Sequence, residues 1–264
     1  MKNEMMIVTP DIALAYLAMN GGNRPMSDSH VEHLALIMKR GEWVFNGDSI
    51  RITTGGRLVD GQHRLSAIIK CGIPQKVMVV TGLDDSVFLT IDCGKSRSAS
   101  DSLAIEGYAC TTALTSCARY AINMEGFGYM YARNINKATS FQVLSAIKKN
   151  PEMQESAKYG QSKKSRKFIG VSLLSFCHYW FLKHDYIAGT EFFNEFESGD
   201  YSYANSPVKA LKEKLVDNAV STAKMSKTDK GGYIFLAFNK YMADESVRVL
   251  RLKKDPKEQL NLNK

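Results

Sequence analysis

The residues of this chain that are best suited to chemistry lie together at the turn from Asp60 to Arg64. The sequence Val59-Asp60-Gly61-Gln62-His63-Arg64-Leu65 ends an apolar run and begins a helical pattern. At such a strand-to-helix turn the first helical N–H groups lack intrahelical acceptors and carry the positive end of the helix dipole, so they can bind phosphate. Gly61 lets a ligand approach the backbone, and Arg64 offers a planar fork for phosphate oxygens. Gln62 and His63 add polar groups in the same turn.

The carboxylate of Asp60 is unfavourable beside a phosphate unless another group offsets its charge. Three roles are open to it: capping the helix that follows, pairing with Arg64 four residues later, or holding a divalent cation such as Mg²⁺. The third role would indicate hydrolysis, with Gln62 or His63 orienting the attacking water, so Asp60, Gln62 and His63 are the candidate catalytic residues. In the structural alternative Asp60 caps the helix and pairs with Arg64, and the turn binds nothing.

Two further segments carry candidate phosphate ligands. Lys95 and Arg97 supply positive charge just before a helix, where they can close over the same phosphate. Arg24 precedes Pro25, whose ring holds the chain extended, so the guanidinium can project into the site. The alternatives are a solvated basic loop in which Ser98 caps the helix, and a surface arginine.

The elements that must position the turn alternate between strand and helix over the first hundred residues. Ser29 and Glu32 have capping-box spacing at the start of an apolar helical stripe, which Gly41 ends. Strand patterns at 50–53 and 57–59 flank a Thr-Gly-Gly turn and predict a tight hairpin. A second helix follows at once and stops at Cys71-Gly72-Ile73-Pro74, after which residues 76–80 predict a central strand.

From about residue 98 onward the apolar pattern takes the period of a helix, and no strand pattern follows. The expected helices lie near residues 98–105, 111–124, 137–149, 171–184, 186–198, 207–225 and 232–246. Residues 151–167 are polar and basic, and 160–167 are the best candidate for a loop or linker. The sequence thus predicts an α+β chain with a phosphate-binding domain over residues 1–105 and an all-helical domain over residues 106–264.

Length and composition exclude several classes of protein. The chain has 264 residues, of which 44% are apolar and 23% charged, so it is neither disordered nor fibrous. No window approaches the roughly 18 apolar residues of a membrane helix, and the start does not read as a signal peptide, so we expect a cytoplasmic protein with no membrane partner. Five cysteines without C-x-x-C spacing encode neither a disulfide framework nor a zinc ribbon. His178 and His184 lie six residues apart on an aromatic-rich helix, so they are not on one face of it. This spacing favours packing of the two rings over joint binding of a metal ion.

The charge of the chain favours a polyanionic partner. It has 35 basic and 27 acidic side chains, a net charge of +8, and the excess is concentrated in residues 133–167 and 201–264. Nucleic acid is the first candidate, and a solvated basic face without a partner is the alternative. The candidate DNA-binding residues are Lys163, Lys164, Arg166 and Lys167, which can equally form a solvated linker.

The string Asp60-Gly61-Gln62-His63-Arg64 resembles the DGQHR motif of a branch of the ParB/sulfiredoxin superfamily. The resemblance covers roughly residues 20–105 and includes Asn23-Arg24-Pro25, Gly41-Glu42-Trp43 and the segment 91–97. Together these look like the ParB-like proteins common in phages and mobile elements. Members of the superfamily bind nucleotide phosphates at the strand-to-helix junction. The catalytic cysteine of sulfiredoxin is replaced here by Gln62, so sulfinic-acid reduction is not expected.

The resemblance implies a fold, a ligand and a set of contacts. The fold would be a small mixed sheet with helices, and the ligand a nucleoside triphosphate of unknown base, with Mg²⁺ if it is hydrolysed. The implied phosphate-binding residues are Arg24, Gly61, Gln62, His63, Arg64, Lys95 and Arg97, with Asp60 as the candidate Mg²⁺ ligand.

The leading hypothesis is therefore a nucleotide-binding ParB-like protein, a candidate NTPase, that acts on or with DNA in the cytoplasm of a cell or of a phage host. One alternative is a non-enzymatic DNA-binding or scaffold protein in which the turn is only structural. Another is a ParB-like nuclease, although no second carboxylate lies close in sequence to Asp60. The oligomeric state is open, a homodimer included.

Overall fold

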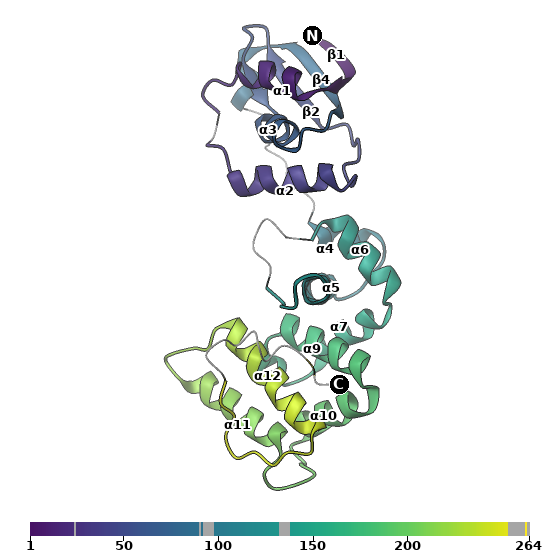
Figure 1. The fold of residues 1–264 in the computed structure, drawn as a ribbon, viewed down its shortest axis with the longest axis vertical. Coiled ribbons are helices and arrows are strands. Elements are labelled where there is room, and N and C mark those ends of the chain that lie inside the picture. Colours follow the sequence, from purple (N-terminus) through teal and green to yellow (C-terminus); the bar gives the residue numbers. More distant parts are fainter. Residues whose placement is uncertain (24, 90, 92–97, 132–137, 253–261, 263–264) are drawn as a thin grey trace. The chain divides into compact units, whose positions relative to one another are not determined.

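The computed structural model describes residues 1–23, 25–89, 91, 98–131, 138–252 and 262 (Figure 1). Over these residues the protein is a mixed α+β structure with one four-stranded sheet and otherwise helices. Contacts divide the chain into two compact units. Unit 1 holds the described residues up to Ile91, and unit 2 holds those from Ser98 onward. The sequence-based division at residue 105 falls at the end of helix α4 (Ala99–Ile105), which belongs to unit 2.

Unit 1 is built on the mixed sheet, whose strand order is β1-β4-β2-β3. Strand β4 pairs antiparallel with β1 and parallel with β2, and β2 pairs antiparallel with β3. The strands are β1 (Lys2–Val8), β2 (Ser49–Thr53), β3 (Leu58–Asp60) and β4 (Gln75–Leu83). The helices are α1 (Pro10–Leu17), α2 (Asp28–Lys39) and α3 (Gln62–Cys71), with the 3-10 turn η1 (Asp85–Leu89) after β4.

The core of unit 1 lies between the sheet and its helices. Helix α3 packs against both α1 and α2 (Figure 1). Alternate residues of β2, Ile50 and Ile52, are buried together with Leu65 and Ile68 of α3. Alternate side chains of a strand point to the same face of the sheet. The face that carries Ile50 and Ile52 is therefore the one against which α3 packs.

The structure confirms the expected hairpin, the helix from residue 62 and the strand at 76–80, and it corrects one predicted cap. Helix α2 begins at Asp28 after an N-cap at Ser27, with no side-chain capping hydrogen bond, so the predicted Ser29–Glu32 capping box does not form. Ser29 lies inside the first turn, and the Glu32 carboxylate instead accepts from Lys70 Nζ at 2.7 Å. Neither strand β1 nor helix α1 was predicted from the sequence. Most of β1 is exposed, so its residues lack the apolar alternation of a half-buried strand.

The described residues of unit 2 form helices joined by turns and include no strand. The predicted helices are present as α4, α5 (Thr111–Phe127), α6 (Ser140–Lys149), α9 (Val171–His184), α10 (Tyr186–Ser198), α11 (Pro207–Val220) and α12 (Lys227–Met242). Ser98 caps α4 and forms a capping box with Asp101. Aromatic rings from α9, α10 and α12 fill the centre of the unit, where Phe181 stacks on Phe238 with ring centroids 3.9 Å apart.

The expected loop at 160–167 is wrong over most of its length. Residues 152–162 form helix α7 (Glu152–Ser162), and a short helix α8 (Arg166–Ile169) follows after three residues. The buried face of α7 consists of Met153, Ser156, Ala157 and Gly160, which are spaced as one helical stripe. Ser156, Ala157 and Gly160 have small side chains, so the buried stripe is only weakly apolar in the sequence. A Cβ on Gly160 would overlap Ser175 Oγ of α9, so close helix packing explains the small side chains.

His178 packs within unit 2, as the sequence predicts. Its ring stacks on Tyr159 with centroids 3.9 Å apart and lies 5.2 Å from the Phe193 ring. Its Nδ1 lies 2.9 Å from Ser156 Oγ. Burial, with the charge of Lys163 adding to it, lowers the pKa of His178 from 6.5 to about 4.

We therefore expect acid to destabilise the protein through His178. The unfolded chain takes up a proton on His178 near pH 6.5, whereas the folded chain does so only near pH 4. The contribution of neutral His178 to the free energy of unfolding is therefore complete above pH 6.5 and is lost as the pH falls toward 4. Between these two pKa values the free energy of unfolding falls by roughly 1.4 kcal/mol per pH unit. Urea unfolding at several pH values should show a shallower acid decline for His178→Gln than for the wild type. Equal declines would contradict the prediction.

None of the helices formed by the described residues combines the length and the apolar character that crossing a membrane requires.

Candidate functional site

A cavity of about 900 Å³ opens in unit 1 where β3 ends and α3 begins. Every residue from Asp60 to Arg64 lines it, so the structure gathers the whole predicted turn on one wall. Its other polar lining residues are Asn23, His30, Glu42, Trp43, Asn46 and Asp48, and its apolar ones are Leu34, Ile37, Val44, Val59 and Ile91. The cavity thus has a polar wall at the turn, aliphatic surface from Leu34 and Ile37 of α2, and a mixed wall on the segment after α2, where Glu42, Asn46 and Asp48 are polar.

Gly61 lets the turn approach β2 closely. It is the N-cap of α3 and has φ 104° and ψ 2°, a left-handed conformation that side chains disfavour. A Cβ at this position would overlap Ile50 Cδ1 and lie 3.3 Å from Ile50 Cα. Because Gly61 fits this space, the first turn of α3 sits directly beside β2.

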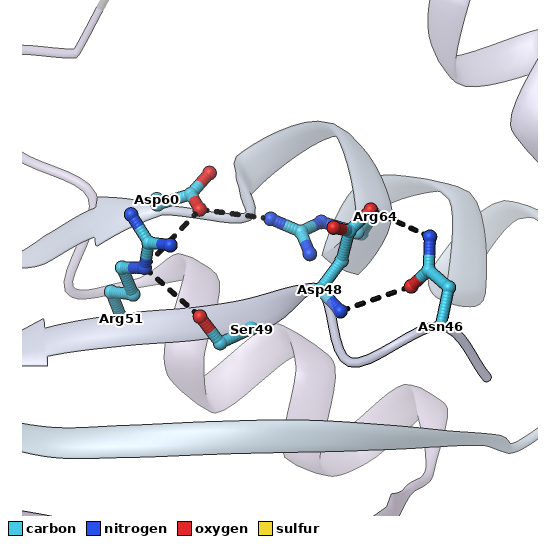
Figure 2. Close-up of polar contacts among 6 residues, drawn as sticks. All are labelled: Asn46, Asp48, Ser49, Arg51, Asp60 and Arg64. Carbon is cyan, nitrogen blue, oxygen red and sulfur yellow. Dashed lines mark hydrogen bonds and ion pairs between the residues drawn. The ribbon is translucent and has the colours of Figure 1, made fainter. Parts of the chain in front are cut away.

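Asp60 and Arg64 form an ion pair on the cavity wall (Figure 2). Arg64 Nη2 donates to Asp60 Oδ2 at 3.0 Å, and the two side chains are only 14% and 17% exposed. Arg51 Nε lies 3.9 Å from the same carboxylate oxygen and donates to Ser49 Oγ at 2.9 Å. Of the three roles open to Asp60, pairing with Arg64 is therefore formed. Capping is not, because α3 has no side-chain capping hydrogen bond among the described residues.

Two buried donors on the cavity wall have no acceptor among the residues that the structure describes. They are Nη1 of Arg64 and Nε1 of Trp43. A buried donor without an acceptor costs roughly 1–3 kcal/mol. A ligand that supplies acceptor oxygens or nitrogens here would offset that cost.

Gln62 and His63 are nearly buried, and both tie α3 to the segment before α2. Gln62 Oε1 accepts from Asn20 Nδ2 at 3.0 Å. His63 Nε2 accepts from the backbone N–H of Ser27 at 3.1 Å, and its ring meets the ring of His30 edge-on at 5.1 Å. Accepting at Nε2 places the proton of the neutral ring on Nδ1. These contacts give both residues a positioning role, and their predicted catalytic role stays a prediction.

The cavity wall carries more acidic than basic charge in the described residues. Glu42, Asp48 and Asp60 supply carboxylates, and Arg64 supplies the one guanidinium of the lining. Asp48 is held at the wall by a local turn, in which its backbone N–H donates to Asn46 Oδ1 and its carboxylate accepts from Asn46 Nδ2, both at 3.0 Å (Figure 2). No cluster of three or more His, Cys, Asp or Glu side chains suited to a metal ion occurs within the described ranges.

Three predicted phosphate ligands, Arg24, Lys95 and Arg97, lie outside the described residues. Their described neighbours Asn23 and Ile91 both line the cavity. The predicted DNA-binding residues lie in unit 2, around the turn from α7 to α8.

Four further lining residues, Asn23, Glu42, Trp43 and Ile91, belong to the segments that carry the family resemblance, whereas sequence reasoning missed the others. Leu34 and Ile37 belong to the apolar stripe of α2, which predicts core packing, yet they line the cavity while Val31, Ala35 and Met38 fill the core. Leu34 and Ile37 lie at the border of that stripe, which distinguishes them from its buried centre. Nothing near Asp48 in the sequence indicates that it lines a cavity, because the turn from Asp60 to Arg64 that it faces is distant in sequence.

Comparison of the chain with models of protein families, with characterised proteins and with solved structures finds no match in any of the three. Its function is therefore inferred from its own residues and their geometry.

Proposed function

We propose that unit 1 binds a nucleoside triphosphate in this cavity, as a ParB-like protein that acts on or with DNA. The observation that carries the proposal is that the turn from Asp60 to Arg64 forms one wall of a cavity of about 900 Å³. This volume lies within the range of roughly 300–1,000 Å³ that is usual for small-molecule sites.

The two walls suit the two ends of a nucleotide. The phosphates lie at the start of α3, a ten-residue helix whose first N–H groups point outward along its dipole. The buried Nη1 of Arg64 supplies a further donor. The base lies against Leu34 and Ile37, which provide aliphatic surface, and Trp43, which provides a ring and a buried N–H.

Charge makes this binding dependent on a divalent cation. A triphosphate would face the carboxylates of Glu42, Asp48 and Asp60, and Mg²⁺ carried by the phosphates would reduce the repulsion that Arg64 and the start of α3 do not offset. Asp60 and Asp48 are the described carboxylates that would hold it at the turn. Bound Mg²⁺ would supply charge neutralisation for hydrolysis, while Gln62 and His63 keep the first turn of α3 in place.

A thermal-shift panel tests the proposal with ATP, GTP, CTP, UTP and their diphosphates, each with and without Mg²⁺. At about 100 times its Kd a bound nucleotide stabilises by about 2.7 kcal/mol, a rise of a few degrees in Tm. We expect one nucleotide to raise the Tm of the wild type in the presence of Mg²⁺ and to have no effect on Arg64→Ala.

Each shift is measured against the same variant without ligand, so a change in basal stability does not enter. Arg40→Ala is the matched control, because Arg40 is exposed at the end of α2 and is absent from the cavity wall. It should keep the full shift. The proposal fails if no nucleotide shifts the wild type, or if Arg64→Ala responds as the wild type does.

A further inference from the structure

Helices α8, α11 and α12 of unit 2 meet, and cationic side chains lie on them and on the turn before α8. Lys230 Nζ of α12 donates to the carbonyl of Phe168 in α8 at 2.9 Å, which joins these two helices. Lys214 of α11 lies 5.5 Å from the ring centroid of Tyr233, one turn along α12 from Lys230. Helices α11 and α12 pack side by side (Figure 1). The set comprises Lys163, Lys164, Arg166, Lys167, Lys214, Lys227 and Lys230, and we name it the basic face.

No member of the basic face forms an ion pair with a carboxylate among the described residues. Some other lysines of unit 2 are paired, as Lys148 is with Glu106 and Lys158 with Glu155. Unpaired like charges repel one another, and a polyanion that spans them relieves this repulsion.

The carboxylates beside the basic face already accept from neutral donors. Glu197 accepts from Ser165 Oγ. Asp229 caps α12 by accepting from Ser226 Oγ at 2.7 Å. Local hydrogen bonds hold both carboxylates against hydroxyl groups, so neither forms an ion pair with the basic face, whose seven cationic side chains outnumber them.

The side chains of the face suit a phosphate backbone rather than unpaired bases. Single-stranded nucleic acid is usually held by exposed aromatic rings on which bases stack. Among the described residues the large exposed aromatic side chains are Phe127, Phe141 and Tyr186, and none of them lies on α8, α11 or α12. The rings beside the face, Tyr159 under Lys163 and Tyr233 under Lys214, are partly buried against the core. Lysine and arginine side chains contact duplex phosphates and read no sequence.

We propose that the basic face binds the phosphate backbone of duplex DNA. The choice of DNA rests on the proposed function, whereas the surface is independent of the nucleotide cavity. Lys214, Lys227 and Lys230 extend the four residues that the sequence singles out, so the site spans α8, α11 and α12 rather than a single loop.

Fluorescence anisotropy with a labelled 20-base-pair duplex of arbitrary sequence, titrated with the full chain between 50 and 200 mM salt, tests this inference. The face variant combines Lys164→Gln, Lys167→Gln and Lys227→Gln, all at exposed positions. Loss of three phosphate contacts should lower the slope of log K against log salt by about 2.7. The control variant combines Lys148→Gln, Lys158→Gln and Lys240→Gln, which removes the same charge from paired lysines and should keep the wild-type slope.

Equal weakening in both triple variants would overturn the proposal, because net charge alone would then explain binding. Tighter binding of a single strand or of duplex RNA of the same length would overturn the assignment to duplex DNA. A single Lys227→Glu variant places a favourable acidic residue in the first turn of α12, so its expected loss of binding does not come from unfolding of that helix. The nucleotide-induced Tm shift should be unchanged in the face variant, which separates failure here from failure of the nucleotide site.

Discussion

Replacing Phe181 with alanine is expected to lower the free energy of unfolding by about 3–5 kcal/mol. Phe181 of α9 is fully buried, and its ring stacks on Phe238 of α12 with the planes 7° apart. It also meets the rings of Phe192, Phe193 and Phe235 within 6 Å. Truncation removes the ring that joins α9 to α10 and α12 and leaves a cavity that these rigid neighbours cannot fill.

Urea unfolding followed by tryptophan fluorescence measures this effect, since Trp180 lies beside Phe181 in α9. Phe141→Ala is the matched control, because the side chain of Phe141 is 70% exposed and its loss should change the free energy by no more than about 0.5 kcal/mol. If Phe181→Ala lowered the free energy of unfolding by less than about 1.5 kcal/mol, the aromatic cluster would not be the main source of stability in the core of unit 2.

Gly61→Ala is expected to lower the free energy of unfolding by about 2–4 kcal/mol, through backbone strain and overpacking together. A side chain disfavours φ 104°, and the added Cβ overlaps Ile50 Cδ1. Ile50 is itself fully buried, so it cannot move away without disturbing β2. The first turn of α3 would then shift from β2 and carry Arg64 out of place, so nucleotide binding should weaken as well.

Gly72→Ala at the other end of α3 separates the two causes. Gly72 also has a left-handed backbone, with φ 73°, but a Cβ there would meet no atom within 4 Å. Its substitution should therefore cost about 1–2 kcal/mol, from strain alone, and leave the cavity intact. In a Trp180→Phe background, the fluorescence of Trp43 on the cavity wall reports the unfolding of unit 1. If Gly61→Ala and Gly72→Ala lowered the free energy of unfolding equally, contact of the added Cβ with Ile50 would not contribute to the effect of Gly61→Ala.

Helices with a strong apolar stripe and clear ends were predictable from the sequence. The bounds expected for 171–184 and 186–198 are those of α9 and α10, because Asp185 caps α10 and Gly199 ends it. Helix α12 was expected to start at 232 but starts at Lys227, where Ser226 and Asp229 form a capping box in a polar stretch. Helix α7 was missed because its buried stripe consists largely of small residues that only the approach of α9 explains.

The turn from Asp60 to Arg64 was also predictable, because the features that form it are local. A strand that ends in Asp-Gly and a helix that starts at once act within one helical turn, so the sequence by itself determined the strand-to-helix junction. For Asp60 it offered the pair with Arg64 as one of three roles, and the structure selected that pair.

Only the tertiary structure decided what faces that turn. His30, Trp43 and Asp48 reach the same cavity from α2 and the segment after it, and His63 accepts from the backbone of Ser27, 36 residues away along the chain. Such contacts depend on how α2 packs on α3 and on the left-handed turn at Gly61 beside Ile50. No local pattern encodes a neighbour so distant in sequence, because side-chain periodicity specifies which face of an element is buried and not what that face meets.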